Sequence, residues 1–144
     1  MPTIHDILAL GPVMPVIVID NSQHAVQLAG ALLRGGLKTI EITLRTPAAL
    51  ESIRAVATAC PDITIGAGTV TRPDLATAAR DAGAAFAVSP GTTPAVIDGC
   101  RAADLPLLPG ASSVSEIMAL QEAGFDAVKF FPANAAGGTG FIKS

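Results

Sequence analysis

Tryptophan and tyrosine are absent from this 144-residue chain, so five phenylalanines supply all of its aromatic rings. Charged residues are also few, at 15% of the sequence, and the formal net charge is −3. A nucleic-acid surface needs an excess of basic residues, and base stacking would have to rest on the phenylalanines alone. These shortages argue against a protein that binds nucleic acid.

Half of the residues are apolar, yet no apolar stretch is long enough to cross a membrane as a helix. The N-terminal residues 1–6 lack the basic-then-apolar build of a secretion signal. The composition suits one domain over residues 1–144, with no disordered tail. We therefore expect a single domain in the cytoplasm, without a membrane or nucleic-acid partner.

Cysteine and histidine, which supply most soft metal ligands, are scarce. Cys60 and Cys100 lie far apart near the ends of helical patterns, and a reducing compartment favours free thiols over a disulfide. Neither cysteine has a nearby histidine that would make it a nucleophile. His5 and His24 both lie in the first sixth of the chain, without a carboxylate or thiol at ligand spacing. We expect no metal site and no cofactor.

Short apolar runs alternate with alanine- and leucine-rich stretches of helical spacing. The apolar runs are Val13–Ile19, Thr39–Leu44, Ile63–Gly66, Ala85–Ser89, Leu105–Pro109 and Ala127–Phe131. The predicted helices are residues 23–34, 47–59, 73–82, 93–102 and 113–123, with a short leading helix over 3–10. Strand, helix and strand at this spacing predict parallel βα units, whose strands are apolar on both faces because helices cover them.

Several predicted helices carry start or stop signals. Ser112 or Ser113 with Glu116 resembles a capping box, and Pro47 suits an early helical position. Glycines follow most helix ends, at Gly35-Gly36, Gly83 and Gly124, where a left-handed cap is wanted.

Two architectures fit this repeat, an open doubly wound sheet and a βα barrel. The regular spacing and the lack of a Gly-x-Gly-x-x-Gly after the first strand favour the barrel. We expect an α/β fold of the (βα)8 TIM-barrel type with only about six βα units present. A complete barrel usually needs about 200 residues or more. The chain ends at Ser144, where a sixth helix is expected to begin after Gly137-Gly138.

Lys129 is the residue that most suggests chemistry. It is one of three lysines, and it lies inside the apolar run 127–131, just before Pro132. An amine buried in a strand without a fixed counter-charge tends toward its neutral, nucleophilic form, which attacks a ketone and forms a Schiff base. The alternative is a lysine whose stem packs while its head reaches water at the strand end.

Alternation along residues 40–45 places Glu41 and Arg45 on one face of a strand and three aliphatic residues on the other. The aliphatic face should pack on helices, so the charged face points inward. The same parity turns Lys129 and Phe131 inward. A carboxylate, a guanidinium and an amine are then expected to meet near the barrel mouth and to favour an anionic substrate. A Glu41–Arg45 pair that satisfies only itself is the alternative.

Small residues at two further strand ends would let a ligand approach the backbone. Thr69 follows Gly66-Ala67-Gly68, and Pro90 follows Ser89. Ordinary turns at the ends of strands explain the same residues equally simply.

Six stretches together resemble the 2-keto-3-deoxy-6-phosphogluconate (KDPG) and 2-keto-4-hydroxyglutarate (KHG) aldolase family, class I aldolases of the Entner–Doudoroff pathway. The stretches are residues 11–17, 41–46, 66–70, 89–91, 106–110 and 129–132, in the family's order and spacing. The Glu-x-Thr-Leu-Arg-Thr and Lys-Phe-Phe-Pro segments are specific, whereas the glycine-rich pieces alone are not.

The resemblance implies a lyase that cleaves KDPG, a 2-keto acid, to pyruvate and glyceraldehyde 3-phosphate without a metal or cofactor, usually as a homotrimer. Lys129 matches the family's Schiff-base lysine. Glu41 matches the catalytic carboxylate, which moves protons through a water molecule. Both assignments come from the family's motif.

The resemblance also assigns the substrate-binding residues. Arg45 and Thr69 match residues that hold the pyruvate carboxylate. Pro90 and Phe131 match residues that line the pyruvate pocket. The family's seventh and eighth strands, which hold the substrate phosphate, have no counterpart in these 144 residues. We therefore expect a C-terminally truncated chain with the pyruvate half of the site and weak or no turnover by itself.

Three other functions stay open. A relative within the family would act on 2-keto-4-hydroxyglutarate or on the galactonate epimer of the substrate. A phosphate-binding barrel isomerase would use Glu41 as a base and Lys129 as a plain electrostatic group. An inactive or partner-dependent barrel fragment would keep the fold pattern without turnover.

Overall fold

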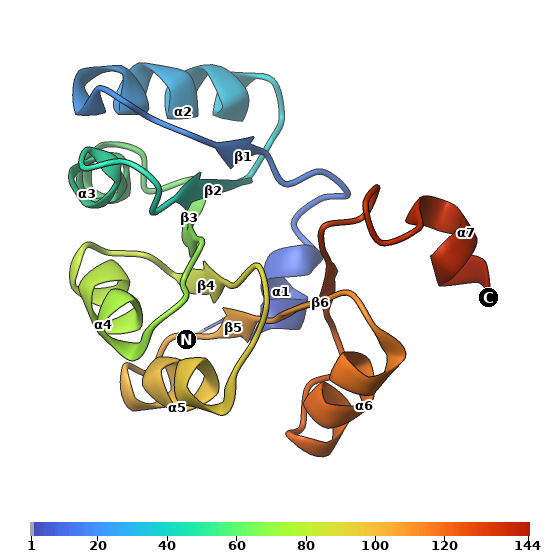
Figure 1. Cartoon of the computed structure of the whole chain (residues 1–144). Helices are drawn as coiled ribbons and strands as arrows, with labels where there is room; N and C mark the ends of the chain where they lie inside the picture. Colours follow the sequence, from blue (N-terminus) through green and yellow to red (C-terminus); the bar gives the residue numbers. More distant parts are fainter. Residues whose placement is uncertain (1) are drawn as a thin grey trace.

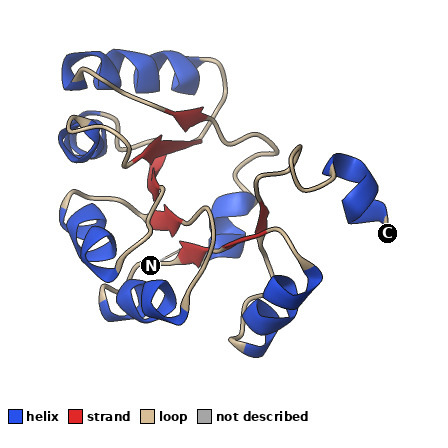
Figure 2. Ribbon diagram, in the orientation of Figure 1, coloured by secondary structure: helices blue, strands red, loops and turns tan. Residues whose placement is uncertain are grey.

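Helices and short strands alternate along the chain in the computed structural model, which describes residues 2–144 (Figures 1 and 2). The strands are β1 Val16–Ile17, β2 Thr39–Thr43, β3 Thr64–Gly68, β4 Phe86–Val88, β5 Leu107–Leu108, β6 Gly110–Ala111 and β7 Lys129–Phe130. The helices are α1 Ile4–Leu8, the short 3-10 helix η1 Ser22–His24, α2 Ala25–Arg34, α3 Ala49–Ala59, α4 Pro73–Asp81, α5 Pro94–Ala102, α6 Val114–Glu122 and α7 Gly138–Lys143. Within residues 2–144, no helix has the length and apolarity that spanning a bilayer requires.

All strand pairs are parallel, and they follow one another in chain order. Strands β1 to β5 form one sheet, and β6 pairs with β7. Only Pro109 separates β5 from β6, and its carbonyl accepts a hydrogen bond of 2.8 Å from the Lys129 amide. Proline lacks the N–H that a central strand needs, so β5 ends before Pro109, and β6 begins beyond the predicted run Leu105–Pro109.

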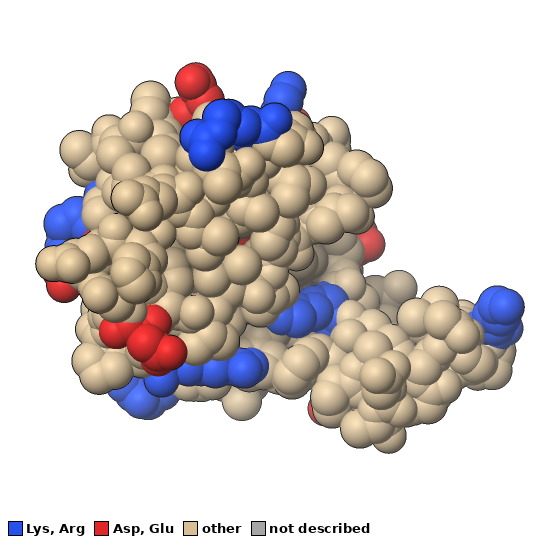
Figure 3. All heavy atoms as spheres, turned by 90° about the horizontal axis from the view of Figure 1, so that it is seen from above, with Lys and Arg blue, Asp and Glu red and all other residues tan. Residues whose placement is uncertain are grey.

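The strands curve, with α2 to α6 along the outside and α1 on the inner side (Figure 1). This arrangement confirms the predicted α/β fold of the TIM-barrel type with six βα units. Strands β1 and β7 are the outermost ones in the described chain. Figure 3 shows a smaller part projecting from the main body, on the side where Figure 1 places α7.

Two apolar cores lie on opposite faces of the curved sheet. The outer core holds residues such as Ile40, Ile42 and Ala67 together with the inner stripes of the helices. The smaller inner core joins Phe86 and Val88 of β4 to Ile7 of α1. Because side chains alternate along a strand, the residues between the outer-core ones on β2 must face inward.

The capping box is confirmed at the start of α6. Ser113 is the N-cap residue, its hydroxyl accepts a bond of 3.3 Å from the Glu116 amide, and Glu116 Oε2 accepts one of 2.8 Å from the Ser113 amide. The expectation for Pro47 is wrong, because residues 47–48 form a turn and α3 begins only at Ala49.

The predicted glycine stops are largely confirmed. Gly36, Gly83 and Gly124 have φ of 92°, 98° and 94°, the left-handed region where glycine is favoured. Gly35 is the C-cap residue of α2. It differs from the expectation because it keeps a right-handed helical conformation, with φ of −76°.

Candidate active site

The inner face of the sheet brings an amine and a carboxylate together. Lys129 Nζ, at the start of β7, lies 3.5 Å from Oε1 of Glu41, in the middle of β2. The Glu41 side chain is 3% exposed, while that of Lys129 is 24% exposed. The lysine therefore keeps some contact with water, and the Glu41 carboxylate, which was expected to meet it, supplies its counter-charge.

Strand register decides which way Lys129 points. The pairing of Gly110 with Lys129 and of Ala111 with Phe130 turns the lysine inward and Phe130 outward. Phe130 stacks on Phe141 of α7 on the outer side, with ring centres 5.3 Å apart and planes 8° from parallel. Because the side-chain period is two, a slip of one residue would exchange these two directions.

Burial controls the proton affinity of Glu41. Desolvation raises the pKa of its carboxyl above the ordinary value, and the charges of Lys129 and then Arg45 oppose that rise. The net direction is upward, so the carboxyl keeps its proton to a higher pH than an exposed glutamate does. A carboxyl with a raised pKa is better suited to giving and taking protons near neutral pH.

Arg45 lies beyond the end of β2 rather than on it. The strand stops at Thr43, and Arg45 stands in the following turn with its side chain exposed. Its Nε donates a hydrogen bond of 3.1 Å to Thr69 Oγ1, just after β3. Arg45 therefore lies in the turn and not on the strand where alternation was expected to place it, and its charge still lowers the pKa of the buried Glu41. Within residues 2–144, the salt bridges do not include a Glu41–Arg45 pair.

Phe131 lies beside the amine, and Pro90 lies against the strand that pairs with Lys129. Lys129 Nζ stands 5.2 Å from the centre of the Phe131 ring, within range of a cation–π contact. Pro90 follows β4, and its carbonyl lies where a side chain at Gly110 would have to be. Since Gly110 pairs with Lys129, this close approach brings the Pro90 turn against the strand beside the lysine.

A closed ring of hydrogen bonds holds the Pro90 turn. The Gly110 amide donates to Ser89 Oγ at 3.2 Å, Ser89 Oγ and Thr92 Oγ1 lie 2.8 Å apart, and Thr92 Oγ1 donates to the Gly110 carbonyl at 3.0 Å. Sequence reasoning missed Ser89, Thr92 and Gly110. A glycine inside an apolar strand pattern was the available signal, since it often marks a close backbone approach.

The KDPG and KHG aldolase family model matches residues 4–144. The chain belongs to this family. It is 48% identical over 139 residues to a 2-dehydro-3-deoxy-phosphogluconate aldolase of Pseudoalteromonas atlantica, covering 96% of this chain and 65% of that relative. It is 46% identical over 138 residues to a KHG/KDPG aldolase of Escherichia coli, again covering 96% and 65% of the two chains. The chain thus spans just under two thirds of the length of these relatives.

A solved structure of the same family resembles the fold described above. It is the KDPG aldolase of Legionella pneumophila, with pyruvate captured at low pH as a covalent carbinolamine intermediate. The sequence identity is 43% and the TM-score is 0.92, over 96% of this chain and 67% of the Legionella chain. A second, a KDPG aldolase of Zymomonas mobilis, has a TM-score of 0.93 at 40% identity, over 99% of this chain and 68% of its own.

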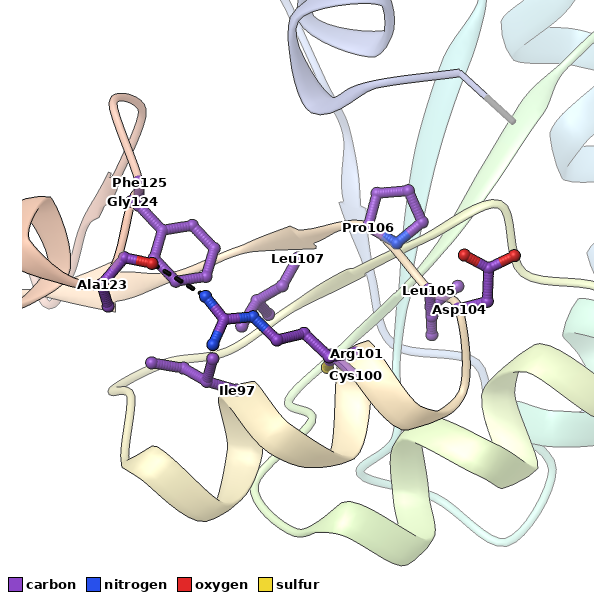
Figure 4. Close-up of a pocket in the computed structure, with 10 residues that line it drawn as sticks. All are labelled: Ile97, Cys100, Arg101, Asp104, Leu105, Pro106, Leu107, Ala123, Gly124 and Phe125. Atoms are coloured by element: carbon purple, nitrogen blue, oxygen red, sulfur yellow. Dashed lines mark hydrogen bonds between the residues drawn. The ribbon is translucent and has the colours of Figure 1, made fainter.

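A pocket of about 320 Å³ lies elsewhere in this aldolase-family fold (Figure 4). Residues 104–107 before and at the start of β5 and residues 123–125 before β7 line it, together with the end of α5. The pocket therefore lies at the N-terminal ends of the strands, whereas Thr69 and Pro90 lie at the C-terminal ends. Arg101 Nη2 crosses its mouth to the Ala123 carbonyl at 2.8 Å. The six predicted site residues are absent from its lining.

The thiols and histidines of the family member lie apart from Lys129. Both cysteines are free thiols, and burial raises the pKa of Cys100 to about 11. His5 Nε2 lies 2.7 Å from Asp126 Oδ1 on the surface. No cluster of three or more possible metal ligands occurs within residues 2–144.

Thr69 stores backbone strain beside Arg45, and this yields a first prediction. Its φ is +62°, an outlier for a β-branched residue. Thr69→Gly and Thr69→Ala both remove the hydroxyl that Arg45 contacts, but only glycine suits the backbone. Chemical unfolding should find the glycine variant more stable than the alanine variant by about 1 kcal/mol. Equal stabilities of the glycine and alanine variants would contradict a strained Thr69.

Proposed function

We propose that this protein is a class I aldolase that cleaves 2-keto-3-deoxy-6-phosphogluconate to pyruvate and glyceraldehyde 3-phosphate. The observation that carries the proposal is the 3.5 Å approach of Lys129 Nζ to a buried carboxylate on the opposite part of the inner face. An amine next to a proton carrier can form and break a carbon–nitrogen double bond. The Legionella relative, which holds pyruvate as a carbinolamine, supports this chemistry.

The reaction begins when neutral Lys129 attacks the C2 ketone of the substrate. The nitrogen forms a bond to C2, and the ketone oxygen takes up a proton, giving a carbinolamine. Loss of the hydroxyl as water then gives an iminium. Glu41, through a water molecule, supplies the proton for the departing oxygen, a task that suits a carboxyl with a raised pKa.

The iminium then acts as an electron sink for cleavage. Glu41, through water, removes the proton of the C4 hydroxyl, the C3–C4 bond breaks, and its electron pair moves into an enamine. The aldehyde product leaves, and C3 takes up a proton that Glu41 returns through water. Water then hydrolyses the iminium to release pyruvate and free Lys129, and Glu41 takes up the proton set free, so the enzyme ends in its starting state.

Four further residues hold the pyruvate portion in this proposal. The Arg45 guanidinium and the Thr69 hydroxyl, already 3.1 Å apart, grip the substrate carboxylate. The Phe131 ring and Pro90 bound the space beside the Lys129 amine. Fixing the carboxylate keeps the C3–C4 bond aligned with the iminium, which is worth several orders of magnitude in rate.

Trapping with pyruvate and borohydride tests the proposal. The reagent reduces an iminium to a stable amine, and peptide mass mapping then locates it. We expect the pyruvate-derived adduct on Lys129 and none on Lys38 or Lys143, both of which are exposed. A protein without an adduct, or with one confined to the two exposed lysines, is not a Schiff-base aldolase. Exchange of pyruvate C3 protons without an adduct would favour the isomerase alternative.

A second substrate, assembly and location complete the proposal. The KHG/KDPG aldolase of Escherichia coli, at 46% identity, supports 2-keto-4-hydroxyglutarate as the second substrate. We propose a homotrimer, which is supported by a 30% identical designed cage built by fusing symmetric oligomeric domains. We also propose the cytoplasm, consistent with two free thiols and with the phosphorylated metabolite as substrate.

A further inference from the structure

The Glu41 side chain lies against a residue of β3 that has no side chain. In the β2–β3 register, Glu41 is opposite Gly66, and Thr43 is opposite Gly68. The glutamate extends along the sheet toward Gly68. A Cβ atom built on Gly68 would overlap Glu41 Oε1 and lie only 2.7 Å from its Cδ and Cγ atoms. Real Cβ atoms do not approach so closely, so a side chain at this position would displace the carboxylate.

Backbone conformation does not explain the glycine at this position. Gly68 is absent from the glycines with positive φ, unlike Gly83 or Gly124. It is the last residue of a regular strand, where a side chain is normally favourable. The space that Gly68 leaves open is filled by Glu41, and this contact gives a physical reason for a glycine there.

We propose that Gly68 is a positioning residue, whose missing side chain lets the Glu41 carboxylate lie against β3 within reach of Lys129. The proposal rests on the function proposed above and adds a residue that does not touch the substrate. An alanine methyl at position 68 would push the far end of the glutamate into the open interior. The carboxylate would then lose both its place beside the amine and part of its burial.

Gly66 provides a contrast on the same strand. The Phe86 ring packs over Gly66 so closely that an added Cβ would overlap it, and Phe86 is fully buried in the inner core. A methyl group there would disrupt packing that holds α1 to the sheet. At Gly68 the neighbour is the movable end of one side chain. Gly66 therefore serves the packing of the inner core, whereas Gly68 serves the position of one side chain.

Proton exchange at C3 of pyruvate is the functional test, with Gly11→Ala as the matched control because nothing lies within 4 Å of a Cβ built there. We expect Gly68→Ala to exchange on the order of 100-fold more slowly, the usual cost of misplacing a catalytic group by about an ångström. The low-pH limit of exchange should also move to lower pH, because burial is the largest influence on the pKa of Glu41 and a better-solvated carboxyl loses the rise that burial causes. An unchanged rate with an unchanged pH limit overturns the proposal.

A stability cycle tests the same contact without any activity. We expect the effect of Gly68→Ala on the Tm to differ by roughly 5 °C between the wild-type and the Glu41→Ala backgrounds, because only the wild type has a carboxylate to displace. An equal change in both backgrounds, or failure of both Gly68→Ala proteins to fold, overturns the proposal. A wild-type chain that traps no pyruvate contradicts the aldolase function, and the cycle still judges the Gly68–Glu41 contact.

Discussion

Lys129→Met is expected to remove aldolase chemistry and leave the fold intact. Methionine keeps the length and apolar character of the stem, and it can still pack on the Phe131 ring that lies 5.2 Å from the amine. It cannot form an iminium. Exchange of pyruvate protons, which needs only the pyruvate half of the site, should fall by roughly 10⁴-fold or more, as when other covalent enzymes lose their nucleophile, and the weak cleavage of the phosphorylated sugar acid should disappear with it. Coupled detection of pyruvate and proton NMR measure the two rates.

The controls for this variant are the two other lysines. Lys38→Met and Lys143→Met change exposed residues outside the inner face, so both rates and the amount of borohydride-trapped adduct should equal those of wild type. A Lys129→Met protein that still traps pyruvate would contradict the assignment of the amine. Far-UV circular dichroism checks that a loss of activity is not a loss of structure.

The same substitution should also affect Glu41. The charge of Lys129 is the largest influence that lowers the pKa of Glu41 against the effect of burial. Without the amine, burial acts with less opposition, and the carboxyl should hold its proton to a still higher pH. The amine and the carboxylate therefore tune each other, which is a reason to expect non-additive effects when both are changed.

The strand and helix pattern could be predicted because it depends on local periodicity. Alternation on β2 predicted that Ile40 and Ile42 face the helices and that Glu41 faces inward, and the outer core confirms the first of these. The inward direction of Lys129 follows from the same parity on β7. The short strand β6, Gly110–Ala111, was not predicted, because the predicted apolar run ended at Pro109.

Features that depend on two distant segments could not be derived from either segment alone. Arg45 lies outside the strand because β2 ends at Thr43, and its partner Thr69 comes from the next βα unit. The left-handed backbone of Thr69 is unusual for a β-branched residue, so its sequence offers no hint of it. The role of Gly68 can be inferred only once the Glu41 side chain is known to lie against it.

Register links the fold to the site. The Lys129 amide bonds to the Pro109 carbonyl, and the Phe131 amide bonds to the Ala111 carbonyl at 3.1 Å. These bonds fix which residue of β7 stands opposite Gly110, and so they set the direction and depth of the amine. The charged pair joins the last strand of the described chain to the second, across the inner face. Its geometry therefore depends on the curvature accumulated over all the strands between them.

Glu41→Gln is expected to raise stability at neutral pH. The folded-state pKa of Glu41 is raised above its ordinary value of 4.5, so the folded protein binds a proton that the unfolded chain has already released. The contribution of this group to stability is complete below pH 4.5 and is lost as pH rises through the folded pKa. Glutamine has nearly the same shape and never ionises, so it avoids the loss. Urea unfolding should give the variant a larger free energy of unfolding than wild type at pH 7, and this difference should shrink toward pH 4.

The same variant should lose activity as it gains stability. Without a carboxylate to move protons, cleavage and C3 exchange should slow by roughly 10²- to 10⁴-fold. Glu51→Gln, at an exposed position in the first turn of α3, is the matched control and should keep both rates. A Glu41→Gln protein that is less stable than wild type, by an amount that grows with pH, would show that attraction to Lys129 outweighs burial. Burial is the strongest influence on the pKa of Glu41, so we expect the buried carboxylate to lower the stability of the fold. The same carboxylate transfers the protons of the reaction, so the site trades stability for activity.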